Sequence, residues 1–333
     1  MPSRYRAWRN LAITEQADTD GSREASEALA GATTRAWVRR LSPRGSLVST
    51  YVAGEQESDA VTAAAEVAER GMRICVDRLV RDADDKLAAD ATVASYLDVL
   101  RALEARGLAA GADLSVRPTA IGLGLADGTQ IALDRAHALG DRAAAVGATV
   151  TFDMQDHHTV DDTLALFHAL RDDHPDTGVA VQARLYRTES DCRDLAGAGS
   201  RVRLCKGAYE EPSSIAFQRP DEVDRSFVRC TKVLLAGEGH PMFATHDTRL
   251  TEIAGSLAAR FRREEGSFEF QIAYGVRPDE QARLLRAGET VRVWIPYGPD
   301  WTGYVAQRVA GRPTRTLGST LRRWRDRPAG GLT

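Results

Sequence analysis

Eight short apolar runs, rich in β-branched residues, recur along the chain and constrain its fold more than any other feature. The stretches between them carry apolar residues at helical spacing, such as Leu164, Leu166, Phe167 and Leu170. Strict alternation of strands and helices predicts parallel strands joined by crossover helices. The eight predicted strands are residues 73–80, 113–120, 149–156, 178–185, 201–208, 241–247, 268–275 and 290–298.

Polar residues towards the ends of these runs decide between two α/β architectures. A closed barrel builds its site from the C-terminal ends of many strands, whereas an open doubly wound sheet concentrates it at one switch point. Nearly every predicted strand here ends in a polar residue, and the strand count is eight. The sequence therefore predicts a single (βα)8 TIM-type barrel. The polar residues are Asp77, Arg117, Asp153, Gln182, Arg203, Lys206, His246 and either Arg292 or Trp294.

The barrel does not occupy all 333 residues. Residues 14–33 are rich in Glu, Asp, Ser, Ala and Gly, so we expect a helical or mobile lead-in over residues 1–44, the barrel over 45–315 and a basic tail over 316–333. Arginines in that tail are more typical of a solvated terminus than of a nucleic-acid site. The formal net charge of −3 also argues against a nucleic-acid partner.

Three further features concern the compartment. No apolar run approaches the roughly 18 residues of a membrane helix, so we expect no integral membrane segment. The N-terminus lacks the apolar core of a signal peptide. The cysteines form no C-x-x-C pair, as expected for reduced thiols. We therefore expect a cytoplasmic protein, with peripheral membrane association left open. The cysteines are Cys75, Cys192, Cys205 and Cys230.

Several common functional motifs are absent. The run GLGLADG at residues 122–128 lacks the third glycine of a dinucleotide fingerprint, and there is no P-loop or nucleophile elbow. His157 and His158 lie near several aspartates, but adjacent loop histidines rarely converge on one ion. We expect no metal site.

The most informative cluster is R-L-C-K-G-A-Y at residues 203–209. On a strand Arg203 and Cys205 point to one side and Leu204 and Lys206 to the other. Gly207 permits close approach of the backbone to a bound ring system. Spacing alone leaves two alternatives open: a ligand site, or a structural ion pair to Asp153 or Asp77.

This cluster resembles the signature R-L-V-K-G-A-Y of the proline dehydrogenase family. Five more segments are similar to that family in the same order: TFDMQD, VQARLYRTESDC, FATHD, FEFQIAYGV and RVWIPYGPDWTGYVAQR. The resemblance covers residues 45–315 and is closest to the monofunctional bacterial type. It implies a distorted (βα)8 barrel that holds FAD, with the isoalloxazine ring across the C-terminal mouth.

The resemblance also implies roles for single residues. Asp153 and Arg203 match positions with a catalytic role, Arg203 lying beside the flavin N5. A cationic Arg203 and Lys206 would stabilise an anionic reduced flavin. The matches to cofactor-binding positions are nearly complete: Met154, Gln182, Arg203, Cys205, Lys206, Gly207, Thr245 and His246.

The substrate side departs from the family pattern. The family's Arg-Arg clamp for a carboxylate is Gln307–Arg308 here, and the gating glutamate that pairs with it is Arg81. A pocket leucine is Ala273 and a tyrosine over the substrate ring is Trp294. The predicted substrate-binding residues are Arg81, Arg117 (a lysine in the family), Tyr209, Ala273, Trp294, Gln307 and Arg308; Gly311 replaces a further glutamate.

The residues at cofactor-binding positions match the family, whereas those at substrate-binding positions differ from it. This contrast indicates that the chemistry is kept and the substrate is changed. The first hypothesis is an FAD-dependent dehydrogenase that oxidises a C–N bond of a proline-like amine, or a hydrazine, by hydride transfer to flavin N5, in specialised metabolism. The second is an ordinary L-proline dehydrogenase giving 1-pyrroline-5-carboxylate, its carboxylate site rebuilt around Arg81 and Arg308. The third is a non-catalytic flavin-binding barrel. For an active enzyme, the family implies a quinone as electron acceptor.

Overall fold

The structure, a computed structural model, describes residues 48–310, with side chains described as far as residue 306. The strands are β1 (Arg73–Arg78), β2 (Asp113–Val116), β3 (Thr149–Phe152), β4 (Gly178–Gln182), β5 (Arg201–Cys205), β6 (His240–Ala244), β7 (Glu269–Ala273) and β8 (Val291–Tyr297). The helices are α2 (Glu57–Glu69), α3 (Lys86–Ala105), α4 (Gly128–Ala145), α5 (Val160–Asp173), α6 (Thr188–Leu195), α7 (Pro220–Ala236), α8 (Thr248–Arg260), α9 (Pro278–Arg286) and α10 (Trp301–Ala310), with the short 3-10 helices η1 (Pro118–Ile121) and η2 (His157–Thr159).

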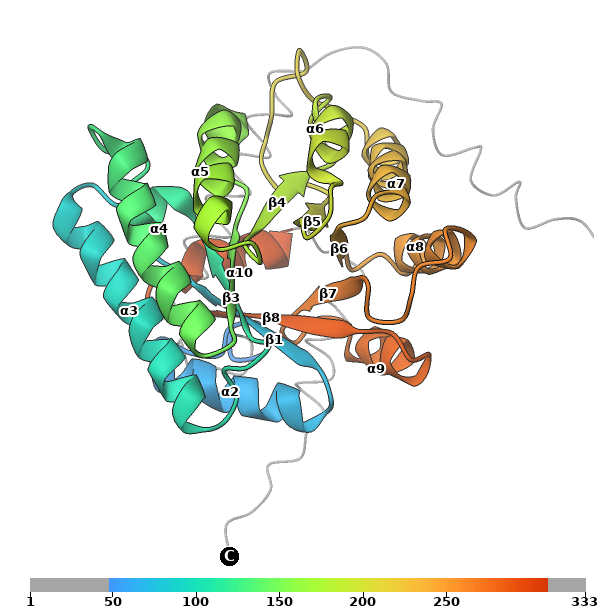
Figure 1. Ribbon diagram of the computed structural model, residues 1–333. Coiled ribbons are helices and arrows are strands. Elements are labelled where there is room, and N and C mark those ends of the chain that lie inside the picture. The colour runs from blue at the N-terminus through green and yellow to red at the C-terminus, as the bar shows by residue number, and fades with distance from the viewer. Residues whose placement is uncertain (1–47, 311–333) are drawn as a thin grey trace, which may run out of the picture. The chain divides into compact units, whose positions relative to one another are not determined.

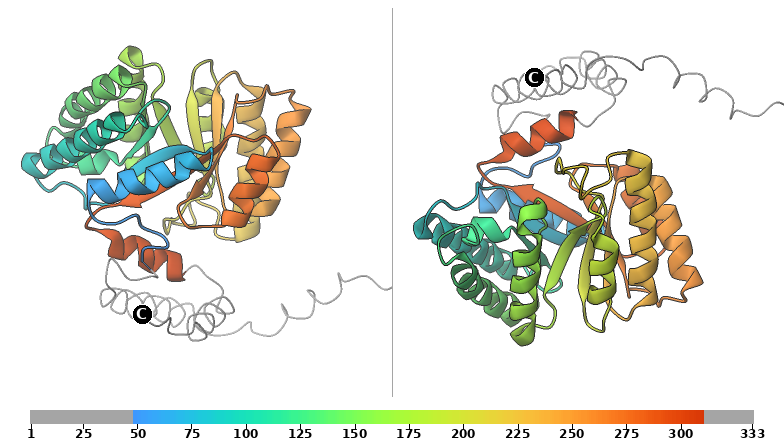
Figure 2. Two further views of the ribbon diagram at one scale, coloured as in Figure 1. Left: turned by 90° about the horizontal axis from the view of Figure 1, so that it is seen from below. Right: turned by 90° about the horizontal axis from the view of Figure 1, so that it is seen from above.

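The eight strands form a closed parallel barrel in the order β1 to β8, and β8 pairs with β1 along six residues (Figure 1). Helices α3 to α9 follow their strands and surround the barrel. Helix α2 precedes β1 and packs outside β1 and β8, where the barrel closes (Figure 2). The predicted (βα)8 barrel is confirmed. The predicted lead-in (1–44) and basic tail (316–333) lie outside the described residues.

Each strand is shorter than its apolar run. The run 113–120, for example, ends as a strand at Val116, because Pro118 has no N–H for the sheet and instead begins η1. The remainder of most runs forms loops at the C-terminal mouth. The residues expected at strand ends therefore lie partly on those loops.

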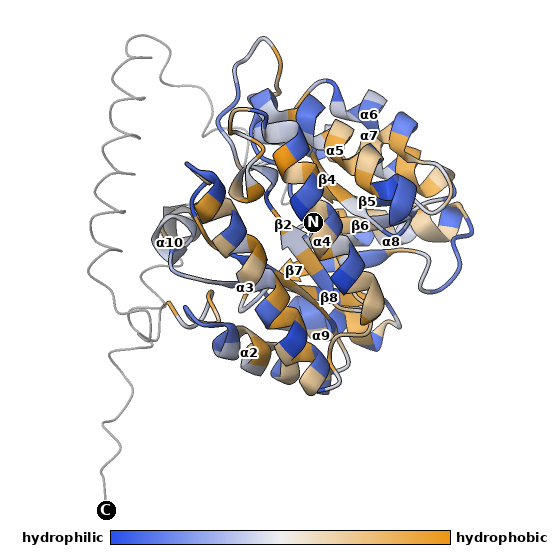
Figure 3. Cartoon of the chain, turned by 60° about the vertical axis from the view of Figure 1, so that its left-hand side comes forward, coloured by the Kyte–Doolittle hydropathy of each residue, from blue (hydrophilic) through white to orange (hydrophobic). Residues whose placement is uncertain are grey.

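The outer layer follows from amphipathic helices. Hydrophilic and hydrophobic residues alternate along them (Figure 3), and the apolar residues pack against outward-facing strand residues such as Val76, Leu204 and Phe243, all fully buried. Caps fix some of the helix starts. The Asp247 side chain accepts a hydrogen bond from the Arg249 N–H at the start of α8.

The barrel interior contains several buried charged side chains. At its N-terminal end Glu269 of β7 accepts hydrogen bonds from Arg292 Nε (2.6 Å) and Nη2 (3.0 Å) of β8. Arg292 also donates to the backbone oxygens of Ile74 and Gly111, at 2.8 Å each. The sequence placed either Arg292 or Trp294 at the C-terminal mouth, and for Arg292 this was wrong. It is the second residue of β8, and its charge is paired inside the barrel base.

Candidate functional site

The upper end of the barrel interior collects side chains from five strands. Because inward positions alternate along each strand, Asp77 of β1, Gln182 of β4 and Ala273 and Trp294 of β7 and β8 share the inward face near the mouth. Asp153 directly follows the last residue of β3. These side chains were predicted to meet at one end of the barrel, and the topology brings them there.

Arg203 crosses the middle of the interior instead of standing at the mouth. Its Nη1 donates to Ser115 Oγ (2.8 Å) and lies 3.5 Å from Asp153 Oδ1. Its Nη2 donates to Asp113 Oδ2 (3.1 Å) and to Cys75 Sγ (3.2 Å). Arg203 thus forms an ion pair with Asp153, as one alternative expected, and a shorter one with Asp113, which the sequence did not indicate. Its Nε has no hydrogen-bond partner within the described part of the chain.

Asp77, which the sequence placed at a strand end and named as an alternative ion-pair partner of Arg203, lies near the mouth. Burial and, to a lesser extent, the nearby Asp153 carboxylate raise its pKa to about 7, although Arg117 and Arg203 act in the opposite direction. The indole of Trp294 hydrogen-bonds the carboxyl group. The other oxygen, Oδ1, is buried and makes no hydrogen bond to any described residue. A carboxyl group of this kind can accept or release a proton at neutral pH.

The mouth around Asp77 is lined by two more predicted residues. Arg117 follows β2 and lies 3.8 Å from Asp82 Oδ1. Tyr209 is 37% exposed, and partial burial together with Asp153 raises the pKa of its hydroxyl to about 12. Arg81 is exposed on the loop after β1.

The two residues that replace the family's carboxylate clamp lie beyond the described side chains. Gln307 and Arg308 fall in α10, and their side chains lie outside the described residues, as does Gly311. Residues 302–310 belong to a different unit from the barrel.

Gln182 and Gly207 form a cradle that fits a flavin. Gln182 is 2% exposed, and its Oε1 has no partner among the described side chains and backbone. Gly207 has φ +104°, and a Cβ there would lie 2.7 Å from that oxygen and 3.0 Å from Arg184 Cβ. A side chain at 207 would therefore close the space. An unpaired acceptor beside bare backbone suits a planar ring that carries an N–H.

The remaining cofactor-side residues take these positions. Lys206 Nζ lies 2.6 Å from Asp224 Oδ1 and 3.2 Å from Asp247 Oδ2, so two carboxylates neutralise its charge. The His246 ring accepts a hydrogen bond from Ala273 N (3.2 Å), which ties the end of β6 to the end of β7. Thr245 and Met154 are buried and Cys205 is half-buried.

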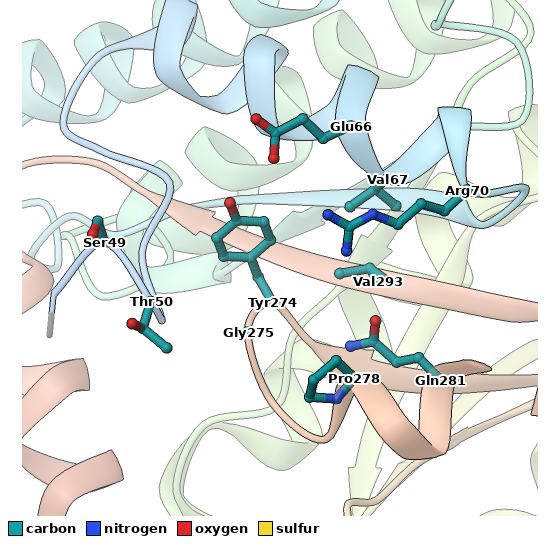
Figure 4. A pocket seen from close by; sticks show the side chains of 10 residues that line it. All are labelled: Ser49, Thr50, Glu66, Val67, Arg70, Tyr274, Gly275, Pro278, Gln281 and Val293. Atoms are coloured by element: carbon teal, nitrogen blue, oxygen red, sulfur yellow. The ribbon is translucent and has the colours of Figure 1, made fainter. Parts of the chain in front are cut away.

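A separate hollow lies outside the barrel. It has a volume of about 210 Å³ and is bounded by α2, the start of α9 and the outward-facing Val293 of β8 (Figure 4). Glu66, Arg70 and Tyr274 line it, but none of the predicted site residues does. We therefore assign the function to the barrel mouth. No cluster of three His, Cys, Asp or Glu residues that could hold a metal ion occurs within residues 48–306.

Comparison with known proteins agrees with this geometry. A model of the proline dehydrogenase family matches residues 60–304. The chain is 30% identical to proline dehydrogenase 1 of Bacillus subtilis (strain 168) over 263 residues, covering 79% of this chain and 86% of that protein. It is 29% identical to proline dehydrogenase of Deinococcus radiodurans over 270 residues, covering 80% and 86%.

A solved structure shows the same fold. The crystal structure of proline utilization A from Bdellovibrio bacteriovorus, inactivated by N-propargylglycine, superimposes with a TM-score of 0.74 at 20% identity. The match covers 82% of this chain and 34% of the other, so this chain spans about a third of the length of that protein.

Proposed function

We propose that this chain, which belongs to the proline dehydrogenase family, oxidises the C–N bond of a small proline-like amine whose shape differs from that of proline. It is an FAD-dependent oxidoreductase that acts on a CH–NH group. The finer choice of substrate depends on the walls of the barrel mouth.

Bound FAD supplies the two-electron acceptor for the oxidation. The protein residues prepare the substrate for it. An amine gives up its electrons only when its nitrogen lone pair is free, so the ammonium proton must leave first. Asp77, with a pKa of about 7 and one carboxyl oxygen that has no hydrogen-bond partner among the described residues, can take that proton. Arg203 is held by Asp113 and Asp153, and its permanent positive charge would stabilise the negative charge that accumulates on a reduced flavin bound above it.

The observation that carries the proposal is the pairing of Ala273 with Trp294. These residues are register partners on β7 and β8. The family pattern pairs a leucine with a tyrosine, so one side chain has become smaller and its neighbour larger. The pocket wall is reshaped rather than simply widened. The indole also donates to Asp77 and, unlike a tyrosine hydroxyl, cannot accept a hydrogen bond in return.

A second candidate is ordinary L-proline dehydrogenase. Arg117, a largely buried cation at the mouth, favours it because a cation there could bind a carboxylate. The names of the relatives at about 30% identity favour it as well.

The third hypothesis, a flavin-binding barrel without catalysis, gains no support from the site. Asp77, Asp153 and Arg203 form a charged cluster that flavin binding alone does not require.

For the electron acceptor we propose a quinone, as the family implies, and hence a cytoplasmic protein that associates peripherally with a membrane. No helix within the described part of the chain is long and apolar enough to cross a membrane.

Steady-state turnover with a dye acceptor separates the two catalytic proposals. We expect L-proline to be a poor substrate for the natural protein and a better one for the double variant Ala273→Leu/Trp294→Tyr. Robust turnover of the natural protein at millimolar L-proline, lost in the double variant, would establish the L-proline alternative instead.

A further inference from the structure

Three hydrogen-bonded side chains, His157, Glu211 and Gln182, lead inward from the protein surface. His157 on η2 is partly exposed, and its Nδ1 lies 2.6 Å from Glu211 Oε2. Glu211, in the segment between β5 and α7, is 5% exposed. Its other oxygen, Oε1, accepts a hydrogen bond of 2.9 Å from Gln182 Nε2. The sequence weighed His157 as a metal ligand and gave Glu211 no role.

The side-chain amide of Gln182 has hydrogen-bond partners for its amino group but not, among the described residues, for its carbonyl oxygen. Its amino group donates to Glu211 Oε1 and to the backbone oxygen of Gln155, at 2.9 and 3.2 Å, which uses both hydrogens. Its carbonyl oxygen faces Gly207. Turning the amide over would set that oxygen against a carboxylate and a backbone carbonyl. The reversed orientation is therefore strongly disfavoured.

Glu211 is itself held in place. A buried carboxylate needs partners for both oxygens, and His157 and Gln182 supply one each. Gln218 Nε2 donates to the backbone oxygen of Glu211 (3.1 Å), which fixes the main chain as well. These contacts hold the carboxylate against the Gln182 amide.

We propose that Glu211 is a positioning residue for FAD, which fixes the Gln182 amide so that its carbonyl oxygen, and not its amino group, faces the flavin. His157 supports it from the surface. The presented acceptor matches an N–H of the flavin ring, and a reversed amide would oppose that N–H with a second donor. The inference depends on flavin binding at the barrel mouth and not on the identity of the substrate.

The proposal is tested by removing the flavin from the full-length protein and titrating the protein with FAD, with quenching of FAD fluorescence as the readout. Glu211→Met removes the acceptor, and we expect FAD to bind about tenfold more weakly, the effect of one oriented hydrogen bond. Glu211→Gln keeps a carbonyl for the amide and should restore most of the affinity. Glu210→Met, at the exposed neighbouring position, is the matched control and should change nothing.

A second background distinguishes positioning from general damage. If Glu211 acts through Gln182, then Glu211→Met has no further effect on FAD affinity in protein that already carries Gln182→Met. An equal loss in both backgrounds, or no loss in the natural protein, overturns the proposal. Should Glu211→Met fail to fold, the partly exposed His157→Met takes its place, with an expected weakening of about threefold that also disappears in the Gln182→Met background.

Discussion

The ion pair at the base of the barrel gives the most quantitative prediction. Glu269 is completely buried and accepts two hydrogen bonds from Arg292 and one from Gln271 Nε2 (2.7 Å). Glu269→Gln keeps the shape but removes the charge, so the buried Arg292 cation loses its hydrogen-bonded carboxylate partner. Breaking a buried pair from one side costs about 3–5 kcal/mol. We expect that loss in the free energy of unfolding, measured by urea denaturation at pH 7.

The pH dependence of this loss has a definite sign. Burial raises the pKa of Glu269, but Arg292 and the hydrogen bonds outweigh it and hold the pKa well below its ordinary value of 4.5. Stability from a lowered pKa is present above that value and fades as the pH falls. The difference between natural protein and variant should therefore be constant from pH 6 to 8 and shrink below about pH 4.

The control substitution lies at an exposed position, and the result that would refute the prediction concerns the location of the ion pair in the barrel. Glu265→Gln, at an exposed site, should change stability by less than about 0.5 kcal/mol. Folded Glu269→Gln should bind FAD normally, because the pair lies at the end of the barrel away from the mouth. A loss below about 1 kcal/mol, or an altered flavin spectrum, would refute the assignment of Arg292 to the barrel base.

Three other substitutions test the mouth. Asp77→Asn should remove a pH dependence of stability. Because the folded pKa of Asp77 is about 7, above the ordinary 3.8, the free energy of unfolding of the natural protein should fall by up to about 4 kcal/mol as the pH rises from 4 to 8. The variant should not show this fall. Identical urea curves of both proteins at pH 5 and at pH 8 would contradict it. Gly207→Ala should lower FAD affinity in the same fluorescence titration, since its Cβ would meet Gln182 Oε1 at 2.7 Å in a left-handed conformation; undiminished binding would place the flavin elsewhere. Ala273→Leu should slow oxidation of the natural substrate more than that of L-proline, and an equal effect on both would show that this wall does not select substrate.

The fold was predictable because strand and helix periodicities are local properties. The eight apolar runs identified all eight strands, and the alternation with helices fixed their parallel order. Strand ends were less predictable. Pro118 marks one plainly, but elsewhere the strand simply continues into a loop that the same apolar run contains.

The site was only partly predictable, because alternation gives the face of a side chain and not its depth. Arg292 and Trp294 share the inward face two residues apart, and the bounds of β8 show that Arg292, its second residue, lies at the base of the barrel. Arg203 is long enough to cross the interior and pair with Asp113, which no spacing rule indicates. The contact between His157 and Glu211 joins residues 54 positions apart and was equally invisible.

Reduction of the bound flavin by substrate in the absence of oxygen tests the central claim most directly, because it needs no external electron acceptor. We expect the purified protein to carry FAD, and the flavin to be bleached at least about tenfold faster by some member of a panel of small cyclic amines, open-chain amines and hydrazines than by L-proline. Bleaching by millimolar L-proline as fast as by any member of the panel would contradict a changed substrate.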